Sequence, residues 1–322
     1  MKTPRSERFG SAYGSIGSFD SVEIGVDFGD ALIADRALSY RFAGLVRDGT
    51  HEYPYFRDDE VFVMGGISCR PQEGSELTFV LDHLDRDDVP GSGGFPLGYD
   101  LDRREAFFGE PDFNYRGAER TTATLIGRHD LGNGWRLGGT ARLSDGADDF
   151  GYAYVSGQTT MEAERSFFVS GGEKDVAIAD IQLAYDGQFG SVSTTTLIGF
   201  EARHFASNGQ SLFAAAPSVS ISYTGKPESV PLFADTETES RGGAIYLQEE
   251  LDWRDRVIAS FGLHHDWIDI TERDRIAGST ATNESSRTGH PAMPATNRRA
   301  SRTILPRSER ATRWGALAHA AT

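Results

Sequence analysis

The chain has 322 residues, a formal net charge of −16 and a hydrophobic fraction of 38%. An acidic chain with only three lysines is a poor nucleic-acid binder, and no apolar run approaches the roughly 18 residues of a membrane helix. Composition therefore excludes a helical membrane protein, but it leaves open a membrane β-barrel, whose strands carry their apolar residues in alternation. The only cysteine, Cys69, cannot form an internal disulfide bond.

The first fifteen residues, Met1–Ser15, contain no apolar segment of the kind that a signal peptide requires. We therefore expect either a cytosolic protein or a chain whose natural beginning lies further upstream.

Alternation of apolar and polar residues with a period of two predicts β-strands along most of the chain. It is clearest at 242–269, where two runs of about ten residues flank the polar turn Trp253–Asp255. Roughly ten residues is also the length that a tilted strand needs to cross a bilayer. In chain order, the eleven predicted strands cover residues 7–13, 22–28, 38–46, 61–69, 77–81, 122–129, 135–143, 177–185, 192–200, 245–251 and 257–263.

The connections between the predicted strands alternate in length. Five of them are short, at 31–36, 70–74, 131–134, 186–190 and 253–256. The connections between these are long, at 48–56, 87–117, 147–173 and 205–240. In an up-and-down meander every second connection lies at the same end, so one end has tight turns and the other has long loops. This arrangement is typical of outer-membrane barrels, although lipocalin-like soluble barrels share part of it.

The sequence thus predicts an all-β fold, an antiparallel up-and-down meander that forms a partial transmembrane β-barrel of about ten or eleven strands. An odd strand number is unusual, because bacterial single-chain barrels close with an even number.

The composition changes near residue 285. Residues 285–322 hold seven arginines and one acidic residue, Glu309, whereas residues 1–284 hold 25 basic and 47 acidic residues. We therefore divide the chain into a partial barrel, 1–284, and an irregular basic tail, 285–322. The tail is either a disordered extension or the product of a reading-frame slip, and we favour the slip.

Four short motifs resemble TonB-dependent siderophore receptors of the ferrichrome/ferrioxamine type. They are the SYR-x-x-GL strand at Ser39–Leu45, the GEPDFN segment at Gly109–Asn114, a Y-x-Q-D-like strand at Ile245–Glu249 and a G-x-R-Y-D-W-like strand at Gly262–Trp267. Glu249 replaces the usual Asp, and His264 and His265 replace Arg-Tyr. Each motif is weak alone, but all four occur in the family's order and on a matching plan of strands and loops.

The resemblance implies a receptor and transporter for ferric siderophores in the outer membrane, with lipid around the barrel and TonB as the family's energy-coupling partner. It covers about residues 3–284, the first half of a 22-stranded barrel. The TonB box, the plug domain and the C-terminal strands of the family are absent from the sequence, so we expect a fragment that does not transport alone. The ferric siderophore would be the transported ligand, and no cofactor is implied.

Siderophore receptors hold their ligand with aromatic side chains near the extracellular mouth, because flat rings cover apolar surface at low entropic cost and Tyr hydroxyls form hydrogen bonds. The matching loops here are Gly91–Tyr99 and Asp149–Tyr154. We predict ligand contacts at Phe95, Tyr99, Tyr152 and Tyr154. The alternative is that these aromatic residues form the interfacial girdle of the barrel or only pack the loops.

Two polar clusters have metal-like composition, Asp82–Asp88 and His264–Asp266. The first lacks EF-hand spacing, and adjacent histidines of a strand point to opposite faces, so we expect neither to bind a metal. The sequence contains no GxSxG or HExxH motif, and we expect no enzyme activity. Two alternatives to a siderophore receptor remain: a porin- or adhesin-type outer-membrane barrel without energy coupling, and a soluble β-rich binding protein.

Overall fold

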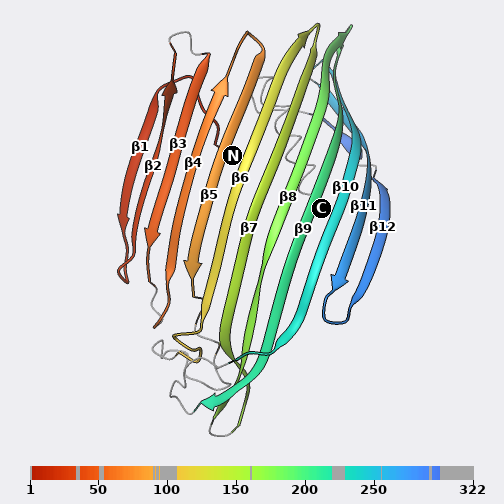
Figure 1. The fold of residues 1–322 in the computed structure, drawn as a ribbon. Helices are drawn as coiled ribbons and strands as arrows, with labels where there is room; N and C mark the ends of the chain where they lie inside the picture. The colour runs from red at the N-terminus through yellow and green to blue at the C-terminus, as the bar shows by residue number, and fades with distance from the viewer. Residues whose placement is uncertain are drawn as a thin grey trace.

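The computed structural model describes residues 2–33, 37–50, 54–89, 91, 94, 107–159, 162–219, 229–254, 256–289 and 292–297. They form one antiparallel sheet in which consecutive strands pair in chain order from β1 to β12, and β13 pairs with β11 (Figure 1). Within these ranges no helix is long and apolar enough to cross a membrane. The strands are β1 (Phe9–Ile16), β2 (Val22–Ala31), β3 (Leu38–Asp48), β4 (Asp58–Cys69), β5 (Ser75–Asp88), β6 (Tyr115–Gly132), β7 (Trp135–Gln158), β8 (Ala163–Phe189), β9 (Val192–Val219), β10 (Leu232–Trp253), β11 (Val257–Asp274), β12 (Ser279–Gly289) and β13 (Ala292–Asn297).

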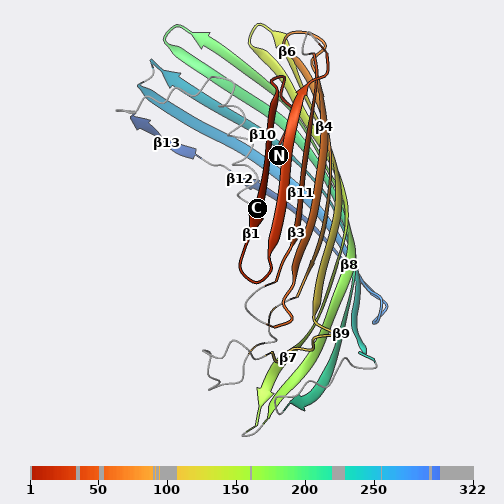
Figure 2. The same ribbon diagram turned by 90° about the vertical axis from the view of Figure 1, so that its left-hand side faces the viewer.

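The sheet is curved like part of the wall of a cylinder (Figure 2). The predicted all-β antiparallel meander is confirmed, and its path contains twelve strands where the sequence indicated ten or eleven. The strands β1 and β12 are the two ends of this path.

The additional strands lie at the C-terminal end of the sheet. In β12 Gly289 pairs with His264, and in β13 Ala292 pairs with Phe261, so β13 takes up the β12 ladder along β11 in the same register, which then shifts between Ser260 and Ile258. The sheet therefore continues past residue 284. The expectation that 285–322 lacks regular strands is not met at Ser285–Gly289 and Ala292–Asn297. Residues 298–322 lie outside the described residues, and the frame slip stays a prediction.

One face of the sheet is apolar and exposed, and we call it the outer face. Leu77 on β5 and Ile181 on β8 are 50% and 52% exposed, and the register brings them into one row across Gly127 and Gly139. Period-two alternation on every strand gives this face its composition. Its exposed apolar residues include Ile24, Val46, Val61, Val63, Ile67, Leu77, Phe79, Leu81, Leu125, Leu137, Leu143, Ile181, Ile198, Phe200, Ile245, Leu247, Phe261, Leu263 and Trp267.

The opposite, inner face carries polar and small residues. Its buried cluster is Ala43, Met64 and Val80, next to the buried hydroxyls of Ser68 and Thr78, which share a hydrogen bond of 2.6 Å. An apolar outer face with a polar inner face is the arrangement of a membrane barrel, in which the outer face contacts lipid and the inner face lines the lumen.

The N-terminal segment crosses the inner face of β2–β4. Lys2 forms an ion pair of 3.0 Å with Asp27, and Arg41 donates hydrogen bonds to the Thr3 carbonyl and to Asp27. Pro4 lies over Gly66, where a side chain would come within 3.2 Å of the proline ring. The chain therefore reaches β1 from the inner side of the sheet.

The short turns are confirmed at one end of the sheet, and at the β6–β7 turn the backbone explains the sequence. Asn133 and Gly134 both have positive φ, at 52° and 86°. A two-residue turn with both central residues in this region matches the twist of the strands that it joins, and Asn-Gly is its preferred sequence. At Gly134 a Cβ would also lie 2.2 Å from the Asp186 carbonyl oxygen, so only glycine fits.

Two of the predicted long loops are wrong. Residues 147–173 are almost entirely strand, since β7 ends at Gln158 and β8 begins at Ala163. Most of the loop predicted at 205–240 is also strand, since β9 continues to Val219 and β10 begins at Leu232. Outside the bilayer both faces of a strand contact water, so the sequence there loses its alternation although the pairing continues. In β7 this is the stretch Asp145–Phe150, which pairs with β6 and β8 without interruption.

The two faces make a direct prediction about charge tolerance. Leu125→Arg places a cation on the outer face near the middle of the apolar band, and we expect it to destabilise the protein in lipid vesicles by about 2–4 kcal/mol. Thr140→Arg, on the inner face of the neighbouring strand, is the matched control and should cost much less. Denaturant titrations of both variants measure the difference, and equal losses would contradict the assignment of the faces.

The β12 pairing predicts the exchange behaviour of its backbone. The amides of Ser285–Gly289 that bond to β11 should exchange more slowly with deuterium than those of the turn 275–278 between β11 and β12. Hydrogen exchange with mass spectrometry on the folded protein in detergent measures this. Equally fast exchange in both segments would show that β12 ends earlier than described.

Candidate functional site

Aromatic side chains gather on the inner face where β7 and β8 extend toward the long-loop end. Phe150, Tyr152 and Tyr154 occupy alternate positions of β7, and Phe168 of β8 pairs with Tyr152. The ring centroids of Phe150 and Tyr152 lie 4.8 Å apart, those of Tyr152 and Tyr154 4.8 Å apart and stacked, and those of Phe150 and Phe168 6.2 Å apart. Phe213 of β9 continues the row beside Phe168 and is 43% exposed. We call these five residues the aromatic cluster.

Two of the four predicted ligand residues thus lie together. Tyr152 and Tyr154 stack on each other, but they belong to a strand and not to the beginning of a loop. Phe95 and Tyr99 lie outside the described residues. Burial raises the pKa of the Tyr152 phenol, which is therefore a neutral hydrogen-bond donor at physiological pH.

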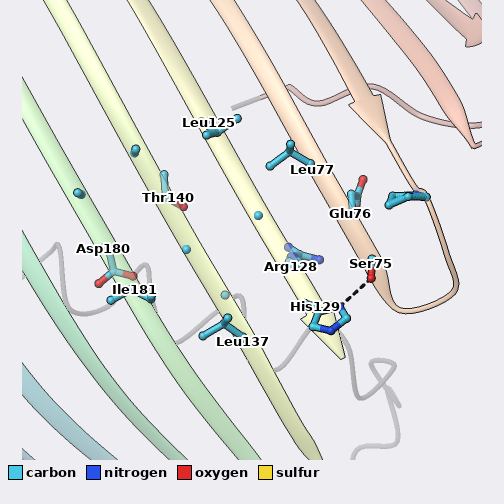
Figure 3. Close-up of a pocket in the computed structure, with 16 residues that line it drawn as sticks. Ser75, Glu76, Leu77, Leu125, Arg128, His129, Leu137, Thr140, Asp180 and Ile181 are labelled. Atoms are coloured by element: carbon cyan, nitrogen blue, oxygen red, sulfur yellow. Dashed lines mark hydrogen bonds between the residues drawn. The ribbon is translucent and has the colours of Figure 1, made fainter. Parts of the chain in front are cut away.

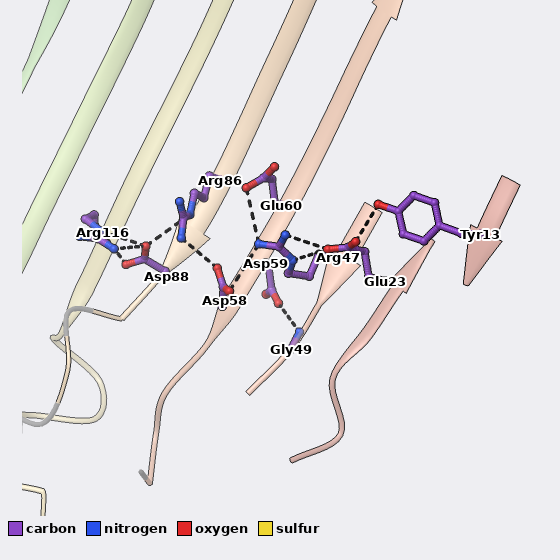
Figure 4. Close-up of polar contacts among 10 residues, drawn as sticks. All are labelled: Tyr13, Glu23, Arg47, Gly49, Asp58, Asp59, Glu60, Arg86, Asp88 and Arg116. Atoms are coloured by element: carbon purple, nitrogen blue, oxygen red, sulfur yellow. Dashed lines mark hydrogen bonds and ion pairs between the residues drawn. The ribbon is translucent and has the colours of Figure 1, made fainter. Parts of the chain in front are cut away.

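A chain of paired charges adjoins the aromatic cluster on the inner face (Figure 4). It reaches the cluster at Arg116 of β6, which pairs with Phe150 in the sheet. Arg116 is half exposed and donates to the buried carboxylate of Asp88 at 2.7 Å. From there the contacts run through Arg86 to Asp58, through Arg47 to Glu60 and Glu23, and from Glu23 to the hydroxyl of Tyr13.

This charge network links six neighbouring strands, β1 to β6, at the long-loop end. Each arginine in it contacts at least one carboxylate, and the Asp88 carboxylate, 3% exposed, depends on Arg86 and Arg116 for its neutralisation. Exposed pairs are worth only about 0.2–1 kcal/mol each, but a buried carboxylate without partners is costly. Of the network's members, Asp88 should therefore contribute most to local order.

A second buried ion pair anchors the end of the loop between β5 and β6. Glu110 and Arg165 of β8 are both fully buried, 2.6 Å apart, and Arg165 also donates to the carbonyls of Phe108 and Gly109 at 3.1 Å. The Asn114 side chain accepts hydrogen bonds from the backbone N–H groups of Glu110 and Ala153. The GEPDFN segment is therefore tied to both β7 and β8.

Aromatic packing supports the same anchor. Phe113 packs edge-on against Phe167 of β8 at 5.0 Å. Phe167 pairs with Ala153, and neighbouring strand residues point to opposite faces, so this contact lies on the other face of the hairpin from Tyr152 and Tyr154. The β7–β8 extension thus carries the aromatic cluster on one face and the loop anchor on the other.

The sequence motif His264–Asp266 does not converge on one point. His264 Nε2 lies 2.9 Å from Asp266 on the inner face, whereas His265 Nδ1 shares a hydrogen bond of 2.8 Å with Thr288 of β12. Across the described part of the chain, no group of three or more His, Cys, Asp or Glu side chains has the geometry to hold a metal ion.

Sequence reasoning missed Phe168, Phe213, Arg116 and the Glu110–Arg165 pair as parts of one region. Phe168 and Phe213 fell in predicted loops, where no face can be assigned. Glu110 was visible inside the GEPDFN motif, but its partner Arg165 is distant in sequence, and only the register of β7 and β8 brings the two together.

The loop anchor leads to a stability prediction. Glu110→Gln and Arg165→Met each break the buried 2.6 Å ion pair from one side and should cost about 3–5 kcal/mol of unfolding free energy, whereas the double variant should recover part of the loss. Arg241→Met, which breaks the exposed Glu239 pair, is the control and should cost less than about 1 kcal/mol. Denaturant unfolding measures all four proteins, and additive losses would show that the two residues act separately.

Comparison with known proteins agrees with this architecture. Residues 71–307 match the model of the TonB dependent receptor-like β-barrel, which is well over half of the chain, and the match continues past residue 284 as the sheet does. The chain is 20% identical over 317 residues to the ferrichrome outer membrane transporter/phage receptor of Escherichia coli strain K12, a match that covers 87% of this chain and 42% of that protein.

Solved structures show the same fold. The ferric-catecholate import receptor Fiu of E. coli K12 in its open form matches with a TM-score of 0.77 at 16% identity, over 90% of this chain and 51% of that one. The ferripyoverdine receptor of the Pseudomonas aeruginosa outer membrane matches with a TM-score of 0.78 at 17% identity, over 90% and 40%. This chain thus spans about half the length of these proteins or less. It belongs to the TonB-dependent receptor β-barrel family, a family of receptors and transporters, and its strands form barrel wall in the outer membrane.

Proposed function

We propose that this chain takes part in TonB-dependent uptake of ferric siderophores, and that its aromatic cluster contacts the siderophore on the way into the lumen. The observation that carries the proposal is the position of Phe150, Tyr152, Tyr154 and Phe168 on the inner face, at the long-loop end of the longest strands. In barrels of this kind the long loops are extracellular, so the cluster would meet a ligand that arrives from outside.

The chemistry of the cluster suits a ferric chelate. A siderophore wraps the metal in oxygen ligands and presents a mixture of apolar and polar surface to the protein. The rings of Phe150 and Phe168 offer apolar area, and the Tyr152 and Tyr154 hydroxyls can donate to chelate oxygens. Because the adjoining carboxylates of the charge network are paired with arginines, they would not compete with the siderophore for iron.

The names of the relatives agree with this proposal. They describe receptors or transporters for ferrichrome, ferric catecholates and ferripyoverdine. In this proposal TonB supplies the energy for transport. Phe95 and Tyr99, which lie between β5 and β6 in the sequence, remain proposed contacts. The GEPDFN anchor would hold the C-terminal end of that segment against β8.

Binding can be measured directly. A ferric hydroxamate titrated into the protein in detergent should quench intrinsic tryptophan fluorescence in a saturable way. Tyr152→Ala and Tyr154→Ala should each raise the dissociation constant about 5- to 100-fold, as expected for the loss of about 1–3 kcal/mol at a central aromatic contact.

Tyr185→Ala is the matched control, because Tyr185 packs against Trp135 on the outer face. It should leave affinity unchanged. Saturable quenching with the same dissociation constant in all three variants would show that the ligand binds away from the aromatic cluster. Ion conductance in planar bilayers without any saturable binding would favour a porin-type barrel instead.

A further inference from the structure

The outer face has a hollow between β5 and β8, near the short-turn end of the sheet (Figure 3). Its volume is about 500 Å³. Leu77, Leu125, Leu137 and Ile181 form its apolar walls, and Gly127 and Gly139 lie between them. The inner-face site at the long-loop end does not involve this hollow.

Two glycines in register create the hollow. Gly127 of β6 pairs with Gly139 of β7, so the sheet lacks two outward side chains at adjacent positions. A Cβ on Gly127 would meet only a Leu77 methyl group, at 3.8 Å, so no close backbone contact requires glycine there. Nor does the backbone require it, since Gly127 is not among the residues with positive φ. What the glycine provides is open space on a face that contacts lipid.

The hollow lies at the depth of one leaflet. The short turns of such barrels face the periplasm. The tilted ring pair Trp135 and Tyr185, with centroids 4.7 Å apart on the outer face, marks the membrane–water boundary at that end. From Leu125 to His129 the strand extends about 13 Å along its own axis, or about 10 Å along the bilayer normal at the tilt of a barrel strand, which is within the roughly 15 Å of one leaflet's hydrocarbon. The hollow therefore lies in the periplasmic leaflet.

Its rim toward the boundary is polar. Ser75 Oγ and His129 Nδ1 share a hydrogen bond of 2.7 Å across β5 and β6. If Ser75 donates this bond, the neutral imidazole carries its proton on Nε2 and can donate it to a further acceptor. The hollow thus combines an apolar trough with an imidazole at the level of the lipid headgroups, and this imidazole donates from Nε2 in the tautomer that accepts from Ser75.

We propose that this hollow binds one phospholipid of the periplasmic leaflet, with an acyl chain over Gly127 and Gly139 and a phosphate oxygen at His129. Lipid tails gain no hydrophobic free energy by leaving other tails, so retention must come from close packing and from the headgroup contact. The trough supplies the packing, because a chain within it touches protein on its sides as well as beneath. This inference requires the membrane placement but not the siderophore function.

A flat partner surface fits the hollow less well. The leucine side chains of its walls stand above the glycine floor, so the outer face of a second copy of this chain would rest on these walls and leave the floor empty. A single flexible acyl chain can reach the floor.

Native mass spectrometry tests the proposal on the protein released in mild detergent from vesicles of phosphatidylethanolamine and phosphatidylglycerol. The wild type should retain one phospholipid per chain. Gly127→Leu fills the trough and should lower the retained fraction at least fivefold. Gly65→Leu adds the same side chain to the outer face of β4, where a Cβ would meet nothing within 4 Å, and should retain lipid as the wild type does.

A second variant covers the headgroup contact. His129→Ala keeps the trough and should lower retention about two- to fivefold, with the folded state of each protein checked by circular dichroism. Retention by Gly127→Leu equal to that of the wild type would overturn the proposal, as would equal losses in Gly127→Leu and Gly65→Leu. A lipid-free dimer that Gly127→Leu abolishes would show that a second copy covers the hollow. If Gly127→Leu does not fold, unchanged retention in His129→Ala overturns the proposed binding mode.

Discussion

An unpaired backbone group in hydrocarbon costs several kcal/mol, and avoiding that cost is the constraint on which this structure depends. Each strand inside the sheet pairs with both neighbours over nearly its whole length, in registers broken at only a few positions. Fixed register then assigns every side chain to a face, because a shift of one residue would exchange the faces. Backbone pairing in a fixed register therefore keeps the apolar side chains on the outer face. It also confines the polar side chains to the inner face and to the strand ends outside the bilayer.

On the inner face, the long-loop end has two halves that meet where Arg116 pairs with Phe150. Toward β1 the surface carries the charge network, in which arginine side chains alternate with Asp and Glu carboxylates and neutralise them through ion pairs. Toward β9 the aromatic rings lie side by side and remain partly exposed. A ligand would gain little from displacing ion pairs that already satisfy one another, so the proposed siderophore contact is assigned to the aromatic half.

The sequence allowed the fold class, the short turns and the apolar strand segments to be predicted, because lipid imposes a strict period of two on the membrane-spanning part of each strand. Prediction from the sequence failed outside the bilayer, where lipid no longer imposes this alternation. In β7 the alternation fades at Asp145 although the strand continues to Gln158, so Tyr152 was placed at the beginning of a loop. The polar β12 was missed for the same reason, since Ser279–Gly289 is exposed throughout and has no apolar face to detect. The positions of Phe168 and Arg165 could be assigned only from the pairing register of β7 and β8.

The β6–β7 hairpin shows that one residue type serves two purposes on the same strands. Gly134 is required by the turn, whereas Gly127 has room for a Cβ and a φ below zero, and its missing side chain leaves the outer face hollow. The aromatic cluster lies on the opposite face, and Gly139 and Phe150 are separated by about 36 Å of β7. Outer and inner faces can therefore change independently, provided that the pairing is kept. A barrel wall can thus vary its contacts with lipid without altering the side chains of its inner face.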